Sequence, residues 1–249
     1  MEIASLDILA AAFAILLAGG LVKGVAGVGL PLVAVTLLTF FLPPHTAVIL
    51  LAIPVLISNL IQMLQGGSLK ASLRRFWPLI LPTAFFTTLG AHLLGDVEGD
   101  TLALILGLMI SILSLVLLIL PKFHIPPRWE RPLAPLAGTV AGLIGGLTSF
   151  YGPVLLVFLL GLNLKRDHFV RSIATVYLAA VLPFTATITV QGLLGWQEFL
   201  ASAAAMVPVY IGMEIGRRLR GHIPEERFKQ GVLALLFIIG CSIILRQMA

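Results

Sequence analysis

The stretch "LAGGLVKGVAGVGLPLVAV", residues 17–35, decides the fold of this 249-residue chain. It places five glycines, one lysine and one proline in an apolar run where a plain membrane helix carries leucine. Glycine permits positive φ angles, and proline suits the first turn of a helix because no amide donor is wanted there. The stretch therefore predicts a helix interrupted after Lys23 and a fresh helix that begins near Gly29 to Pro31.

The composition assigns the whole chain to a membrane. Hydrophobic residues make up 59% of the sequence and charged residues 11%, and the mean hydropathy is +1.08. Runs of about 20 apolar residues, enough to cross a bilayer core of about 30 Å, recur along the chain. These features predict an all-α polytopic membrane protein with a single integral membrane domain. No P-loop sequence is present, so we expect no ATP hydrolysis by this chain and no cofactor.

Two of the apolar segments are too long for one simple crossing. Residues 8–42 are interrupted between Lys23 and Pro31, and residues 133–162 between Gly145 and Pro153. Six further runs have ordinary spanning length: 46–65, 76–95, 101–120, 172–191, 197–216 and 229–246.

The distribution of charge favours a particular path for the two broken segments. If each crosses the membrane once, the basic loops divide between the two sides. If each instead enters and returns on the same side as two half-helices that meet near the midplane, 14 of the 16 lysines and arginines lie on one face. The positive-inside rule prefers this re-entrant arrangement, with that face cytoplasmic and both termini outside.

Two pairs of matching segments indicate an internal duplication. The segments 18–33 and 141–156 share two glycines and a proline at an offset of 122 residues. The segments 82–97 and 208–223 share Pro-x7-Gly-x4-Gly at an offset of 126 residues. With the charge argument, these matches predict two inverted repeats, residues 1–124 and 125–249. Each consists of a broken re-entrant hairpin and three transmembrane helices, a plan associated with secondary transporters.

Each break is expected to present a helix N-terminus to a solute. The free amides and the positive end of the helix dipole favour an anion, and Lys23 adds a full positive charge to the first break. Hydroxyl groups near the second break suit the binding of an oxyanion, although simple capping of the half-helix is an equal alternative. The candidate substrate-binding residues of the two breaks are Lys23, Gly24, Gly27, Gly29, Gly146, Thr148, Ser149 and Tyr151.

Polar residues inside neighbouring runs extend this list. Asn59 and Gln62 form a polar stripe that lines the pathway or bonds a neighbouring helix. Thr175 and Tyr177 occupy the corresponding helix of the second half. Glu214 is the one acid placed within a span, and Arg217 and Arg218 follow it at the spacing of helix-surface salt bridges, so we expect a salt bridge rather than a proton carrier.

These residues give the chain a recognisable pattern. The glycine-rich first segment, its echo "GLIGGLTSFYGP" (142–153) and the Pro-x7-Gly-x4-Gly helix ends resemble the TauE/SafE family of sulfite and organosulfur-anion permeases. The resemblance covers nearly the full length of both halves. It implies a secondary carrier for small sulfur-containing anions, such as sulfite, sulfoacetate or another organosulfonate, in a prokaryotic inner membrane.

Several alternatives stay open at this point. The solute could be another small anion or a metal cation, although the sequence gives no metal-ligand cluster. The chain could instead be a membrane assembly subunit whose glycines serve helix packing alone. We expect no catalytic residues, no nucleic-acid partner and, besides the anionic solute, only the bilayer as surroundings. Neither the coupling ion nor the oligomeric state follows from the sequence, and a homo-oligomer is one option.

Overall fold

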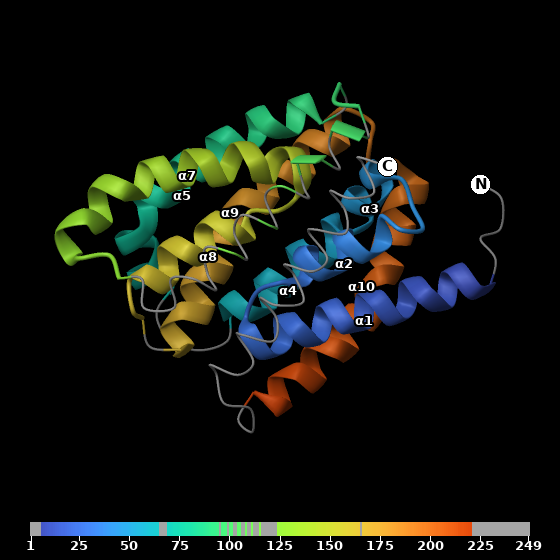
Figure 1. Ribbon diagram of the computed structural model, residues 1–249, viewed down its shortest axis with the longest axis horizontal. Helices are drawn as coiled ribbons and strands as arrows, with labels where there is room; N and C mark the ends of the chain where they lie inside the picture. Colours follow the sequence, from blue (N-terminus) through green and yellow to red (C-terminus); the bar gives the residue numbers. More distant parts are fainter. Residues whose placement is uncertain are drawn as a thin grey trace.

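The computed structural model describes residues 6–64, 69–94, 96–98, 100–101, 124–164 and 166–220, with isolated positions between 104 and 115. Within these residues the regular structure is helical, as predicted (Figure 1). The helices are α1 (Leu6–Ala26), α2 (Leu30–Leu38), α3 (Pro44–Leu50), α4 (Ala52–Leu64), α5 (Leu69–Leu93), α7 (Pro127–Thr148), α8 (Gly152–Gly161), α9 (Arg166–Val190) and α10 (Trp196–Leu219).

Five helical segments are long and apolar enough to cross a membrane: Ile8–Ala26, Pro44–Leu64, Leu69–Leu93, His168–Val190 and Trp196–Leu219. They confirm a multi-pass membrane protein. Four of them overlap spans expected from the sequence. Most of the expected span 101–120, and all of 229–246 with Cys241, lie outside the described residues.

The first broken segment folds into a hairpin at the predicted place. Gly27 and Gly29 have φ angles of 84° and 103°, values that only glycine adopts without strain. Helix α2 begins at Leu30, with proline in its first turn. It then returns along α1, because Gly19 of α1 faces Leu30 and Ala34 of α2.

The second broken segment repeats this plan with different residues. Helix α7 ends at Thr148, and Ser149 takes the left-handed conformation at a φ of 60°. Helix α8 begins at Gly152, again with proline in its first turn. The turn is therefore made here by a serine, where the first segment uses glycines.

The arms of the two hairpins are unequal, which corrects the expectation of two half-helices in each segment. Helices α1 and α7 contain 21 and 22 residues, so each is roughly 31–33 Å long, and α1 is also apolar enough to cross the bilayer. The return arms α2 and α8 contain only 9 and 10 residues. The prediction failed because it placed the start of the first interruption at Lys23, whereas α1 stays helical through Ala26.

Two of the five glycines of the stretch 17–35, Gly20 and Gly24, allow close contact between parallel helices. A Cβ at Gly20 or Gly24 of α1 would meet the carbonyl oxygen of Val209 or Met213 in α10. Because the residue numbers rise together along the contact, α1 and α10 run in the same direction. Helix α7 packs on α5 in the same manner through Gly138, Gly142 and Gly146 (Figure 1).

These two helix pairs match residue by residue. A Cβ at Gly142 would meet the carbonyl oxygen of Thr83, and one at Gly146 that of Thr87. Thr83 and Thr87 precede Val209 and Met213 by 126 residues, the offset of the second sequence match. Helix α1 of the first half therefore packs on α10 of the second half, and α7 of the second half packs on α5 of the first. The contacts fall at equivalent positions in the two pairs.

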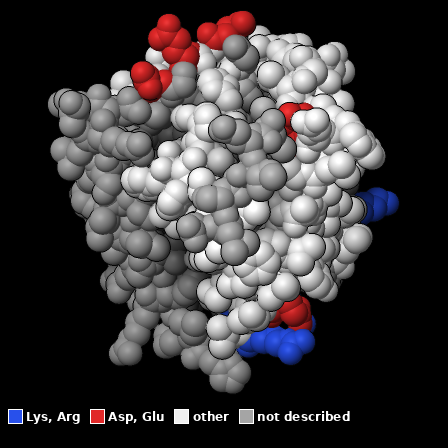
Figure 2. Space-filling view, turned by 90° about the vertical axis from the view of Figure 1, so that its right-hand side faces the viewer, with Lys and Arg blue, Asp and Glu red and all other residues white. Residues whose placement is uncertain are grey.

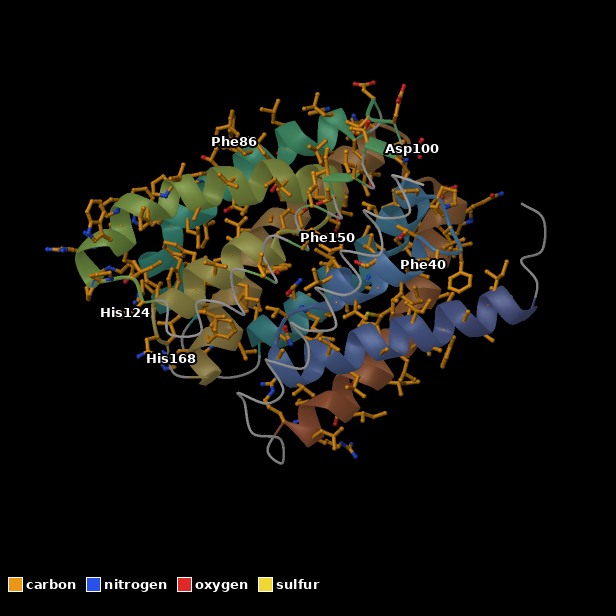
Figure 3. All side chains as sticks on the ribbon, in the orientation of Figure 1. Phe40, Phe86, Asp100, His124, Phe150 and His168 are labelled. Atoms are coloured by element: carbon orange, nitrogen blue, oxygen red, sulfur yellow. The ribbon has the colours of Figure 1, made fainter. Side chains whose placement is uncertain are left out.

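The ends of the bundle differ in charge. Figure 3 places His124 and His168, which flank basic loops, at one end and Asp100 at the other. On the face in Figure 2, acidic side chains gather at one end, and Lys and Arg side chains lie beside an acidic group at the opposite end. Phe40, which follows α2, lies toward the Asp100 end in Figure 3, as expected for a hairpin that returns to its own side.

Candidate functional site

Lys23 lies in the last turn of α1 and is buried, with 2% of its surface exposed. Its Nζ donates a hydrogen bond of 2.8 Å to Oδ1 of Asn59 in α4. Among the ion pairs of the described residues, none involves Lys23. A buried amine whose partner is a neutral amide has no ion pair to compensate a positive charge, and an ionisable side chain placed this way within a membrane is a candidate for function.

The polar stripe of α4 faces the first break. Asn59 also donates from Nδ2 to the carbonyl oxygen of Val55 at 2.7 Å. Gln62 donates from Nε2 to the carbonyl oxygen of Lys23 at 3.2 Å, while its own Oε1 is buried without a hydrogen-bond partner. The sequence analysis named Lys23, Asn59 and Gln62 as candidate site residues, and the structure brings them together, with both amides in contact with the lysine.

Helix α9 connects the first break to the second. The ring of Tyr177 lies 5.8 Å from Nζ of Lys23, a distance that permits a cation–π interaction. The Tyr177 ring also meets the ring of Tyr151 edge to face, with centroids 6.0 Å apart. Tyr151 is buried and its hydroxyl has no hydrogen-bond partner. Side-chain contacts from Lys23 to Tyr177 and from Tyr177 to Tyr151 therefore connect the two breaks inside the bundle.

Two helix ends meet at the first break, and they differ in their hydrogen bonding. The carbonyl oxygen of Gly24, near the negative end of α1, accepts hydrogen bonds of 3.0 and 2.6 Å from the guanidinium of Arg220. The N-terminus of α2 at Gly29 has no side-chain cap. The positive end of α2 therefore has no side-chain cap, while a carbonyl oxygen at the negative end of α1 is bonded to a cation, and an uncapped helix N-terminus favours an anion.

Other predicted site residues are engaged in local contacts. Thr148 donates to the carbonyl oxygen of Ile144 and accepts from the amide of Phe150, and neither bond caps α8, whose N-terminus has no side-chain cap. Thr175 donates to the carbonyl oxygen of Arg171. The helix contacts of Gly24 and Gly146 explain these two glycines without a solute. Gly27 packs under Val170 of α9, and Ser149 is buried at the second turn.

Arg171 is a buried cation that the sequence analysis counted only as part of a basic loop. It lies in α9 directly after Val170, which covers Gly27, and only 6% of it is exposed. Its Nε has no hydrogen-bond partner. Its position beside other basic residues hid this burial, and nothing in a single sequence separates a solvated loop arginine from a buried one.

The expected salt bridges of Glu214 are confirmed. Glu214 accepts hydrogen bonds from Arg217 at 2.6 and 2.8 Å and from Arg218 at 2.9 Å, so it forms the expected salt bridges. In the part of the chain that the structure describes, no three His, Cys, Asp or Glu residues come together as a metal site. The only buried charged side chains of that part are the cations Lys23 and Arg171.

Comparison with known proteins identifies the family of the chain. No curated protein and no solved structure matches the chain. The family description "Sulfite exporter TauE/SafE" matches residues 11–243, which include both broken hairpins and the helices that surround them. Nearly the whole sequence thus fits one family of membrane transporters, and the chain belongs to the sulfite exporter TauE/SafE family.

Proposed function

We propose that this protein is a secondary transporter of a small sulfur-containing anion, such as sulfite or an organosulfonate, across the prokaryotic inner membrane. The family supports membrane transport of this general type. The observation that carries the anion assignment is Lys23, a buried ammonium group whose hydrogen-bond partner is the neutral amide of Asn59. A cation or metal carrier needs buried acidic ligands instead, and the buried charges of the described residues are positive.

The proposed binding site lies between the first break and α9. Lys23 supplies the charge, and the uncapped N-terminus of α2 supplies amide donors. Tyr177 and Tyr151 extend the site toward the second break, where the unpartnered Tyr151 hydroxyl is available to an oxyanion. The solute would accept these hydrogen bonds in place of its hydration shell.

The proposed mechanism is alternating access by two inverted repeats, residues 1–124 and 125–249. Its support is the matched register of the α1–α10 and α5–α7 contacts, in which each first helix packs on the other half. In this arrangement one hairpin opens to each side of the membrane. Rocking of one repeat against the other would then expose the site alternately to the two sides.

The test is uptake of labelled sulfite and of a labelled small sulfonate into proteoliposomes. We compare the native protein with Lys23→Met, which keeps the length of the side chain and removes its charge. The control is Lys70→Met, because Lys70 is exposed at the start of α5. Saturable uptake that Lys23→Met abolishes and Lys70→Met retains supports the proposal. Equal uptake by all three proteins contradicts the site, and no uptake of either anion by folded native protein contradicts the substrate class.

An assembly subunit without transport activity is distinguished by solvation of the breaks. Gly27 is unsuitable for a cysteine probe, because its φ is 84° and a Cβ there would meet Val170. Ser149 already holds a side chain at positive φ, so Ser149→Cys in a Cys241→Ala background is the better probe. Protection of this thiol from a membrane-impermeant reagent by an added small sulfonate, which unlike sulfite does not react with thiol reagents, supports a solute pathway. A thiol that never reacts supports a dry packing interface.

A further inference from the structure

An apolar groove lies on the outer surface between α5 and α7, away from the proposed transport site. Its volume is about 440 Å³, and its walls include Trp77, Leu81 and Phe85 of α5 and Pro135 and Thr139 of α7. Trp77, Leu81 and Phe85 are 57–69% exposed. In a membrane protein such a surface faces lipid, and a groove of this length holds an acyl chain more closely than a flat helix face does.

Exposed arginines continue both walls of this groove toward the basic end of the bundle. Arg74 lies three residues before Trp77 on α5, and Arg131 lies four residues before Pro135 on α7. These spacings place each arginine on the same helix face as the groove residue that follows it. Both side chains are exposed, as is that of Arg128 one turn before Arg131.

An ion pair fixes the two arginine-bearing helix ends beside each other. Arg75 of α5 donates to Glu130 of α7 through two hydrogen bonds of 2.7 and 2.9 Å. Arg74 and Arg131 are the sequence neighbours of this pair, so they lie at the same height along the two helices. Because Glu130 is already engaged, no ion pair of the described residues neutralises Arg74, Arg128 or Arg131.

We propose that this groove is a binding site for an anionic phospholipid. One acyl chain lies between α5 and α7 against Trp77, Leu81 and Phe85, and the lipid phosphate is bound by Arg74 and Arg131. Guanidinium groups bind phosphate oxygens through paired hydrogen bonds, and basic clusters between membrane helices on the cytoplasmic side select anionic headgroups. Charge complementarity favours this lipid over a second copy of the chain, which would bring the same arginines together.

The test is native mass spectrometry of the detergent-purified protein with phosphatidylglycerol or phosphatidylcholine of identical acyl chains. We expect the native protein to retain phosphatidylglycerol at least about fivefold more than phosphatidylcholine. The double variant Arg74→Gln/Arg131→Gln should lose this preference. The control Arg217→Gln/Arg218→Gln removes two positive charges from the same end of the bundle, but from α10, which does not line the groove. This variant should retain the preference for phosphatidylglycerol.

A second variant tests the acyl chain separately from the headgroup. Thr139→Trp fills the groove and should lower the retention of both lipids without changing the charge. Equal retention of the two lipids by the native protein overturns the proposal, as does an unchanged preference in Arg74→Gln/Arg131→Gln. A lipid-free dimer whose α5–α7 face is protected from labelling also overturns it, in favour of a second copy. The result is independent of whether the protein transports sulfite.

Discussion

The two broken hairpins have the same architecture and different chemistry. The α1–α2 break turns on two glycines at positive φ and carries the buried charge of Lys23. The α7–α8 break turns on Ser149 and carries hydroxyl and aromatic groups without a charge. A duplicated backbone can therefore keep its helix contacts while the polar groups at the turn diverge, which separates the residues that preserve the fold from those that suit a solute.

The largest effect is expected where the two halves are most alike. Gly24→Ala and Gly146→Ala each drive a Cβ into the backbone of the partner helix. Glycine to alanine stabilises an exposed helix by up to about 1 kcal/mol, but overpacking against a backbone that cannot rotate away costs ~3 kcal/mol. Both variants should therefore lower the apparent melting temperature in detergent by about 6–12 °C. A large difference between the two losses would show that the two contacts are not equivalent.

The next prediction concerns the charge that only the first hairpin carries. Asn59→Asp places a carboxylate where Oδ1 now accepts the hydrogen bond of Lys23. The resulting ion pair neutralises the site, so uptake of sulfite into proteoliposomes should fall by at least ~10-fold, equivalent to about 1.4 kcal/mol. The melting temperature should not fall, because the lysine gains a partner.

Asn59→Leu is the matched control for this variant. It removes the hydrogen bond and leaves the positive charge of Lys23 in place. If both variants reduce uptake equally, the role of Asn59 is to position the lysine, and the charge argument fails. If Asn59→Asp alone reduces uptake, the positive charge itself binds the solute.

The same comparison shows what can be read from the sequence. The breaks near Gly29 and Gly152 were predicted correctly, since paired glycine and proline have few uses inside an apolar run. Lys23, Asn59 and Gln62 were each named as candidate site residues because polar side chains inside a membrane are costly, but their contact with one another was not predicted. Features that depend on the residue types within one segment can therefore be predicted from a single sequence.

What the sequence did not predict depends on long-range packing. Gly24 was interpreted as part of the break, but its contact with α10, nearly 190 residues away, keeps it helical. The burial of Arg171 likewise depends on helices that are distant in sequence. Neither fact follows from residue type or spacing, since the same glycine permits a turn or a close helix contact, according to its neighbours.

A smaller effect should appear at the glycine turn of the first hairpin. Gly29→Ala forces alanine into a φ of 103° and brings its Cβ to 2.9 Å from Cγ1 of Val22. The left-handed backbone costs ~1–2 kcal/mol for a residue with a Cβ, which lowers the melting temperature by about 2–8 °C. Gly192→Ala is the control, because Gly192 has a φ of 74° and open space around it. A loss at Gly29 no larger than that at Gly192 would assign the cost to the backbone alone.

The smallest effect, with the opposite sign, is expected at the serine turn of the second hairpin. Ser149 already occupies the left-handed region at a φ of 60°, so Ser149→Gly removes backbone strain there. Glycine also gains freedom in the unfolded chain, which offsets part of the gain. We expect a net stabilisation of about 0.5 kcal/mol, seen as a rise of 1–2 °C in melting temperature by the scaling of ~2–4 °C per kcal/mol. Asn163→Gly, at an exposed φ of 51°, should gain less, because asparagine tolerates this conformation well. A fall in stability for Ser149→Gly would mean that the buried serine side chain is itself needed at the turn, and the second break would then resemble the first in depending on a specific polar group.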